Sequence, residues 1–297
     1  MFFIVPTKQK DVLKQNTESR MSDEPRPEPA FAEESKSAYE RAADQGVDPR
    51  CIPQALHGPP PVGKDIVTPA YTDEDRANWR FLFKRQMELL PSRAGKAFLD
   101  GVVTLGMTDD AIPSLSSVSK KMESATGWRV ARIPGLLHEK DFFSLLADRV
   151  FPSTDYLRGK EELDYTPAPD CFHDMFGHMP MLTEPAFADY YQLFGQASLN
   201  AKGHQRIQLE RMHWFTVEFG LVRQKEGLRI FGAGILSSKD EVAHALNGKA
   251  EIIPYSAARV VEQDYEVWHL QPRLFALESF NQLVSEFRGW IRDQGLM

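Results

Sequence analysis

Hydrophobic and polar positions recur with a helical period along most of the chain after residue 70. Thr72 can cap a helix with an acidic first turn, and apolar residues follow at intervals of three and four from Trp79 to Leu90, until Pro91. The same spacing predicts helices over residues 93–105, 112–126, 140–149, 170–176, 184–199, 205–223 and 279–291. These segments predict a mainly helical fold.

Only short runs favour β-structure. Residues 128–133 alternate Trp, Val and Ile with polar positions and end at Pro134-Gly135, and weaker runs cover 228–231 and 251–255. Strands and helices do not alternate as in a doubly wound fold. We therefore expect a mainly α, α+β domain with a few short strands on one side.

The N-terminal part has a different composition. Half of the 20 prolines lie in residues 1–70, charges and small residues follow one another from 22 to 50 without a period, and Gly58 precedes three prolines. Such a segment buries little apolar surface. We predict a disordered Pro-rich tail over residues 1–69 and one folded domain over 70–297.

Charge and cysteine content narrow the function classes. The 35 Lys and Arg against 42 Asp and Glu give a formal charge of −7, which offers no general positive field for a nucleic acid backbone. The two cysteines, Cys51 and Cys171, are too few for a disulfide framework, and no stretch reaches the roughly 20 apolar residues of a membrane span. We expect a cytoplasmic protein without nucleic acid or membrane partners.

Two histidines form the first chemical signal. His173 and His178 are five residues apart, so on a regular α-helix they would point about 140° away from each other. Gly177 and Pro180 suggest that the helix ends at 176 or 177 and that His178 turns back from a non-helical exit. An isolated histidine pair, however, is more often held by hydrogen bonds to the backbone than by a metal.

An acidic residue supplies the second signal. Glu218 lies among Trp214, Phe215, Val217 and Phe219, and burying a carboxylate in such surroundings costs several kcal/mol unless a cation neutralises it. Either a basic side chain or a metal must lie beside it. With both histidines it gives the two-imidazole, one-carboxylate set that binds non-haem Fe(II) with open positions, although Zn(II) with a hydrolytic water fits the same donors.

Four motifs together extend the argument. They are Tyr165-Thr166-Pro167-Ala168-Pro169-Asp170, the His173–His178 segment, Trp214-Phe215-Thr216-Val217-Glu218-Phe219-Gly220 and Phe231-Gly232-Ala233-Gly234-Ile235-Leu236-Ser237-Ser238. In this order they resemble the pterin-dependent aromatic amino acid hydroxylases, above all the small single-domain bacterial phenylalanine 4-hydroxylases. The resemblance covers about residues 70–297 and includes neither a regulatory domain nor a tetramerisation helix, so it implies a monomer.

The resemblance implies a function and a set of site residues. It implies Fe(II), a tetrahydropterin (tetrahydrobiopterin or a related bacterial pterin), and hydroxylation of L-phenylalanine by O₂ to L-tyrosine, with a pterin-recycling dehydratase acting downstream. The metal would be held by His173, His178 and Glu218; the pterin would meet Gly135, Leu137, Phe142 and Asp174; the substrate would meet Arg158, Thr166, Pro169, Trp214, Gly234 and Ser237. Ser237 would also bond His173, and Arg158 would receive the substrate carboxylate.

Two positions bear on the details, and three other functions stay open. His213 stands where animal relatives have tyrosine, and its five-residue distance from Glu218 predicts that it faces away from the metal. Val267 matches the aliphatic residue of the phenylalanine enzymes. A tryptophan hydroxylase, a zinc hydrolase and a metal-stabilised binding module whose Pro-rich tail recruits a partner are the alternatives.

Overall fold

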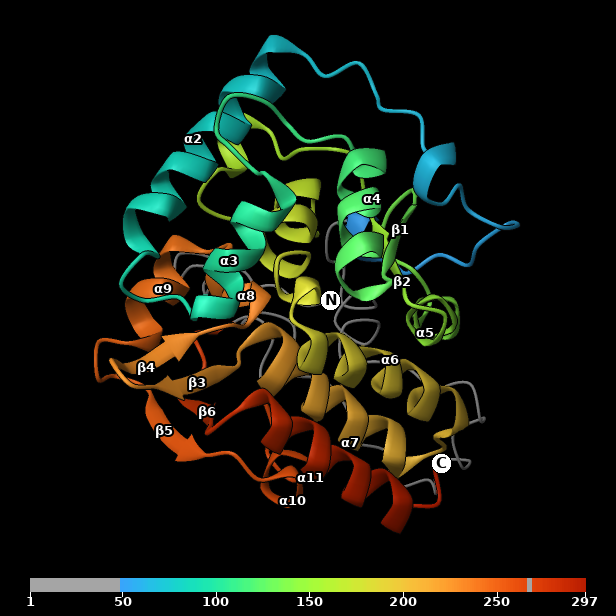
Figure 1. The fold of residues 1–297 in the computed structure, drawn as a ribbon, viewed down its shortest axis with the longest axis vertical. Coiled ribbons are helices and arrows are strands. Elements are labelled where there is room, and N and C mark those ends of the chain that lie inside the picture. The colour runs from blue at the N-terminus through green and yellow to red at the C-terminus, as the bar shows by residue number, and fades with distance from the viewer. Residues whose placement is uncertain (1–48, 266–268) are drawn as a thin grey trace, which may run out of the picture.

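The computed structural model describes residues 49–265 and 269–297 and shows a helical domain with two small sheets (Figure 1). The helices are α2 (Asp73–Leu89), α3 (Lys96–Leu105), α4 (Leu115–Thr126), α5 (Glu139–Ala147), α6 (Pro185–Asn200), α7 (His204–His213), α8 (Ala233–Leu236), α9 (Lys239–Ala245), α10 (Ala257–Val260) and α11 (Phe280–Asp293). Short 3₁₀ turns cover Pro49–Cys51, Gly63–Asp65, Lys160–Glu162 and Met181–Thr183, and two π-helical turns, η6 (His173–His178) and η8 (Trp214–Glu218), interrupt the pattern.

The long predicted helices are present close to their expected limits. Thr72 and Asp75 form a reciprocal capping box at the start of α2, as the acidic first turn suggested. In α11 the Ser279 side chain accepts a hydrogen bond from the Gln282 backbone, and Leu283, Phe287 and Ile291 form the buried face. The predicted mainly helical fold is confirmed.

One predicted helix, over residues 205–223, is too long. Helix α7 ends at His213, the chain continues as the π turn η8, and a strand, β3 (Leu221–Gln224), begins two residues after Phe219. Gly220 lies at this change of direction, where an added Cβ would stand 2.1 Å from the ring of Phe231. Tertiary pairing of β3 therefore overrides the local helical period.

The strands form two sheets. Strands β1 (Arg129–Arg132) and β2 (Val150–Ser153) pair in parallel across α5. The second sheet has the order β4-β3-β6-β5, in which β4 (Gly227–Ile230) runs antiparallel to β3, while β6 (Arg273–Leu277) is parallel to both β3 and β5 (Glu251–Pro254). Figure 1 shows this sheet beside α11 and α10, at the opposite end of the molecule from the turn that precedes α2.

The end of the predicted tail lies against the domain. Residues 1–48 lie outside the described residues, but residues 49–69 pack on the fold: Cys51 is buried, the Gln54 backbone N–H bonds Leu136 O, and the Arg132 N–H bonds Pro61 O. Backbone groups of this Pro-rich stretch thus bond to β1 and to the loop before α5, while the division of the chain into a tail and a domain at residue 69 stays a prediction.

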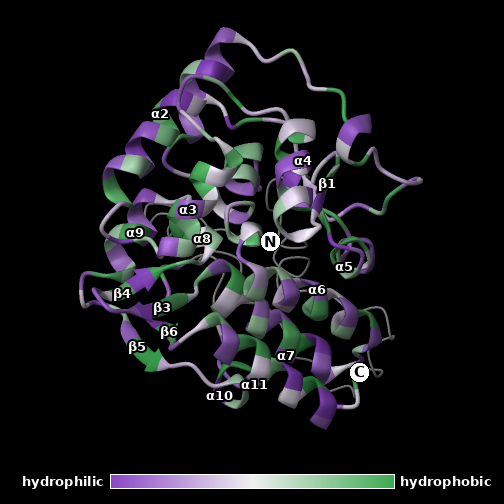
Figure 2. Ribbon diagram, viewed as in Figure 1, coloured by the Kyte–Doolittle hydropathy of each residue, from purple (hydrophilic) through white to green (hydrophobic). Residues whose placement is uncertain are grey.

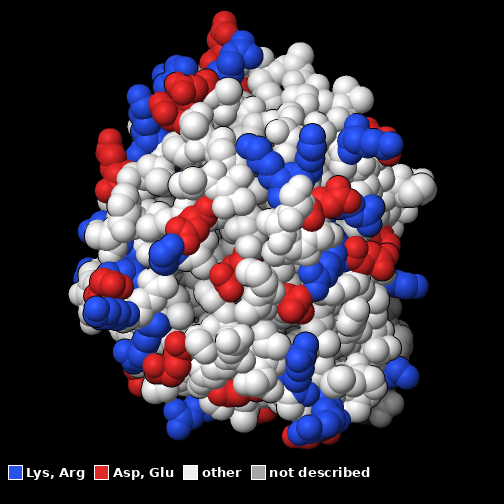
Figure 3. Space-filling view, viewed as in Figure 1, with Lys and Arg blue, Asp and Glu red and all other residues white. Residues whose placement is uncertain are grey.

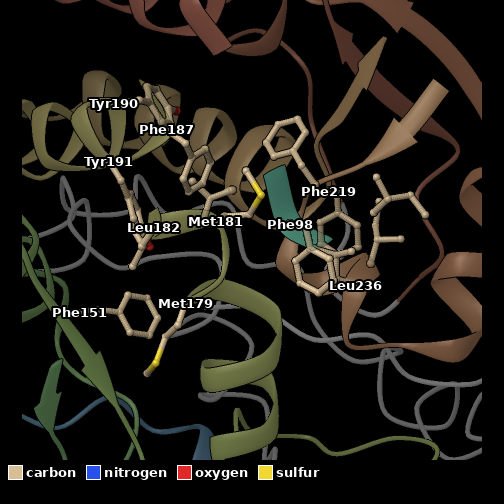
Figure 4. Close-up of a cluster of buried hydrophobic side chains, with 14 of the residues drawn as sticks. Phe98, Phe151, Met179, Met181, Leu182, Phe187, Tyr190, Tyr191, Phe219 and Leu236 are labelled. Atoms are coloured by element: carbon tan, nitrogen blue, oxygen red, sulfur yellow. The ribbon is translucent and has the colours of Figure 1, made fainter. Parts of the chain in front are cut away.

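The core is rich in aromatic and sulfur-containing side chains. Hydrophobic residues lie on the inward faces of the helices in Figure 2. Figure 4 shows Met179, Met181 and Leu182, which directly follow η6, among Phe187 and Tyr191 of α6. This packing anchors the chain immediately after His178.

The surface mixes both signs of charge. On the face shown in Figure 3, Lys and Arg side chains alternate with Asp and Glu rather than gathering into a field of one sign. No helix among the described residues is long and apolar enough to cross a membrane.

Candidate metal centre and adjoining cavity

Two π-helical turns carry the three predicted metal ligands. In a π turn the backbone N–H bonds the carbonyl five residues earlier, as Met179 N does to Asp174 O and Phe219 N to Trp214 O. Five residues then make about one turn, so His173 and His178 point to the same side. The predicted non-helical exit for His178 is wrong, because the helix widens there instead of ending.

Helix α8 lies between the two turns and contacts both. Its glycines permit this approach: a Cβ on Gly232 would stand 2.4 Å from the Glu218 carbonyl oxygen, and one on Gly234 would stand 3.1 Å from the same atom. On the other side, Gly177 of η6 meets Ala233 at a similarly short distance. Small residues therefore let α8 pack directly against both π turns, which are far apart in the sequence.

The three ligand atoms converge at one buried point. His173 Nε2 and His178 Nε2 are 2.9 Å apart, and the Glu218 carboxylate lies 3.3 Å from His178 Nε2 and 3.7 Å from His173 Nε2. All three side chains are buried, and one atom from each lies within 4.8 Å of the others. Two imidazoles and one carboxylate in this arrangement suit an iron ion.

The tautomer of His173 follows from its outer partner. The Ser237 hydroxyl donates its one hydrogen bond to the Ala233 carbonyl at 2.8 Å. Its oxygen therefore accepts a hydrogen bond from the N–H at His173 Nδ1, at 2.9 Å. The proton of a neutral His173 is therefore on Nδ1, and Nε2 presents a lone pair to the centre, as metal coordination requires. Burial, reinforced by the His178 charge, lowers the pKa of His173 to about 3, so the ring stays neutral.

Glu218 is the buried negative charge of the site. Burial raises its pKa, but the neighbouring His178 and His173 outweigh this effect and hold the pKa below its usual range. Neither carboxylate oxygen has a hydrogen-bond donor among the described residues. A buried carboxylate without donors, facing two imidazole nitrogens, fits a cation at the common point.

A cavity adjoins this centre through Asp174 of η6. Its wall combines apolar side chains such as Leu137 and Phe142 with polar ones such as Thr154 and Asp174, as small-molecule sites do. The cavity is lined by the four residues that the family resemblance assigned to the pterin, Gly135, Leu137, Phe142 and Asp174. Three residues of α7 also line it: Arg206, Glu210 and His213.

Asp174 presents an unpartnered oxygen within this cavity wall. Its Oδ2 accepts hydrogen bonds from the Thr154 backbone and hydroxyl at 2.8 and 3.0 Å, whereas Oδ1 is buried without a partner among the described residues. Burial raises the pKa of Asp174 well above its usual value. The side chain is thus a fixed hydrogen-bonding group rather than the solvated helix residue that its position also allowed.

The predicted substrate residues lie mostly outside this cavity. Pro169 lines it, whereas Arg158, Thr166, Trp214, Gly234 and Ser237 do not. The Trp214 ring is buried, stacks on Tyr265 at 4.4 Å between ring centroids and tilts against Phe219. Thr166 Oγ1 donates to the Ala168 carbonyl at 2.9 Å.

Arg158 is buried rather than a surface residue. Its Nε and Nη2 donate to the Asp170 carboxylate at 2.8 and 2.7 Å, and its guanidinium lies 5.8 Å from the Phe172 ring centroid. Asp170 also accepts from the His173 backbone N–H at 3.1 Å. One carboxylate therefore connects the arginine to the first metal ligand, and Nη1 is the guanidinium nitrogen that these two bonds do not use.

His213 differs from its sequence prediction. Because η8 is a π turn, the separation of five positions brings His213 to the same side as Glu218. There His213 lines the cavity, and it lies close enough to Glu218 to lower the pKa of that carboxyl group. The spacing repeats that of His173 and His178, and this repetition is the signal that sequence reasoning passed over. Val267, by contrast, lies outside the described residues.

The fold is shared with known proteins. The sequence model of the family described as biopterin-dependent aromatic amino acid hydroxylase matches residues 61–294. The chain belongs to this family of hydroxylases. Curated members include the phenylalanine-4-hydroxylase of Ralstonia nicotianae, 43% identical over 73% of this chain and 70% of the relative, and that of Chromobacterium violaceum, 40% identical over 72% of each.

Solved hydroxylase structures agree with the fold. The apo phenylalanine hydroxylase of Colwellia psychrerythraea is 34% identical, with a TM-score of 0.74 over 79% of this chain and 92% of that one. The Chromobacterium violaceum phenylalanine hydroxylase with bound iron(III) and 7,8-dihydrobiopterin is 39% identical, with a TM-score of 0.72 over 75% and 82% of the two chains. The expected domain type is thereby confirmed.

Proposed function

We propose that the chain is a phenylalanine 4-monooxygenase, which converts L-phenylalanine to L-tyrosine with O₂ and a tetrahydropterin at Fe(II). The observation that carries this proposal is the convergence of His173, His178 and Glu218 at one buried point beside a cavity. The relatives named phenylalanine-4-hydroxylase, and the one solved with iron and 7,8-dihydrobiopterin, support the same substrate and cofactors.

The protein's own residues hold and orient the reactants. His173, His178 and Glu218 would bind the metal on one side only, and the ion, when bound, supplies redox chemistry with positions left for O₂. Ser237 fixes the His173 ring, and buried aromatic residues around the centre exclude water. Exclusion of water protects a reactive centre from side reactions.

The cofactor would occupy the cavity described above. Phe142 offers a ring on which a flat bicycle can stack, the turn at Gly135 and Leu137 offers backbone groups, and Asp174 offers its unpartnered Oδ1 to a polar atom on the rim of the ligand. The cavity wall is continuous with η6, so a ring held there lies next to the metal.

The substrate would enter from the side of Arg158. Asp170 holds the guanidinium in a fixed orientation and neutralises it, and the Nη1 edge is then preorganised for the carboxylate of an amino acid. Thr166, Pro169, Trp214 and Gly234 would shape the space for the aromatic ring. We infer in addition that the enzyme acts in the cytoplasm as a monomer and passes its oxidised pterin to a recycling dehydratase.

The test is tyrosine formation by the purified protein with phenylalanine, Fe(II), a reduced pterin and oxygen. We expect His173→Ala and Glu218→Ala to lose both iron and turnover, while His244→Ala, a histidine of α9 that bonds the Gln271 carbonyl, retains them. Activity that survives both ligand substitutions would refute the assignment. Oxygen-independent hydrolysis with bound zinc would identify a hydrolase, and preference for tryptophan in competition would identify a tryptophan hydroxylase.

A further inference from the structure

His213 is a buried imidazole with one nitrogen engaged by the protein. It is the last residue of α7, only 4% exposed, and its Nε2 lies 2.9 Å from the Tyr191 hydroxyl. Its ring packs against Tyr191 and Phe194 of α6 on one side and faces the cavity on the other. These contacts fix both the position and the orientation of the ring.

The partner decides which nitrogen carries the proton. The described structure gives the Tyr191 hydroxyl one hydrogen-bond partner, His213 Nε2, and a buried phenol must donate its proton to an acceptor. Burial raises the pKa of Tyr191 well above its usual value, which keeps that proton on the oxygen. Nε2 is thus the acceptor, and the proton of the imidazole lies on Nδ1.

Nδ1 has no hydrogen-bond partner in the part of the chain that is described, and His213 forms part of the cavity wall. The same wall contains Asp174, whose Oδ1 is unpartnered, and Phe142, whose ring stands at 79° to the imidazole with centroids 6.1 Å apart. A flat ligand stacked on Phe142 would therefore also stand nearly perpendicular to His213. An N–H in the imidazole plane can then reach an acceptor on the edge of that ligand.

We propose that His213 is a cofactor-positioning residue of this chain, which donates a hydrogen bond from Nδ1 to an acceptor atom of the pterin ring. The inference rests on the proposed function. It gives the cavity wall two polar groups, the His213 imidazole N–H and the unpartnered Oδ1 of Asp174, which together favour a heterocycle with polar atoms on its rim.

The test is calorimetric binding of 7,8-dihydrobiopterin to the iron-loaded protein without oxygen. Asparagine places its amide NH₂ near the position of Nδ1, whereas glutamine reaches the position of Nε2 and faces Tyr191. We expect His213→Asn to bind within threefold of the unmodified protein, and His213→Gln and His213→Phe to bind about five- to thirtyfold more weakly, the effect of one lost hydrogen bond. Tyr191→Phe should weaken binding less, because the tautomer is no longer fixed.

Controls separate this role from a packing role. His244→Phe removes an imidazole that bonds Gln271 outside the cavity and should leave binding unchanged. If His213→Gln binds the pterin like the unmodified protein and His213→Asn does not, the histidine serves only to hold Tyr191, and the inference is refuted. Equal binding by all variants, with turnover intact, also refutes it but leaves the proposed function standing, whereas an unmodified protein that neither binds the pterin nor forms tyrosine refutes both.

Discussion

Glu241 makes the stability of this protein depend on pH in an unusual direction. It is the third residue of α9, its side chain is 1% exposed, and neither carboxylate oxygen has a partner among the described residues. An acid at this helix position often bonds the backbone of the capping residue, but the Ser238 N–H bonds the Ile235 carbonyl instead. Glu241 therefore occupies an apolar site as a neutral acid.

The magnitude follows from its pKa. Burial, with a smaller contribution from Asp240, raises the pKa of Glu241 from 4.5 to about 8. Between these values the unfolded chain has released the proton and the folded chain still binds it, so stability falls as pH rises and levels off above pH 8. At 1.36 kcal/mol per pKa unit the ceiling is about 5 kcal/mol, and local opening that admits water lowers the expected loss to about 3 kcal/mol.

The assay compares urea unfolding of the unmodified protein and Glu241→Gln between pH 5 and 9, at equal metal content. The difference between the two free energies of unfolding cancels the titration of all other groups. We expect Glu241→Gln to gain about 3 kcal/mol relative to the unmodified protein over this range, whereas Asp240→Asn, which removes only the smaller contribution of an exposed neighbour, should keep most of the original pH dependence. A constant difference between the proteins from pH 5 to 9 would refute the argument.

Three further outcomes test the site. Ser237→Ala removes the partner that fixes the His173 tautomer and should weaken iron binding ten- to hundredfold in chelator competition. Arg158→Lys loses the planar fork and should raise the KM for phenylalanine at least tenfold with a smaller change in the pterin KM. Deleting residues 1–48 should leave the pterin KM unchanged, whereas deleting residues 1–60 removes the backbone bonds to the cofactor loop and should raise it several-fold, as steady-state kinetics would show.

The helical period, the caps and the three side chains of the buried two-imidazole, one-carboxylate cluster could be predicted from the sequence. The spacing of apolar residues at intervals of three and four predicted α2, α6 and α11, because this local spacing decides which face of a helix is buried. A carboxylate among aromatic residues likewise required a cation wherever the fold placed it. These conclusions depend on chemistry and short-range geometry, which the chain carries without its tertiary contacts.

The π turns, the position of His213 in the cavity wall and the packing of residues 49–69 were decided only by the tertiary structure. A turn of five residues is unfavourable locally, and here α8 packs against η6 and η8 through close glycine contacts, which no local pattern reveals. The burial of Arg158 likewise depends on Asp170, which the fold places beside the guanidinium. Ligand types are set by the chain, but their convergence within a few ångströms depends on packing between distant segments, and that is a property of the whole fold.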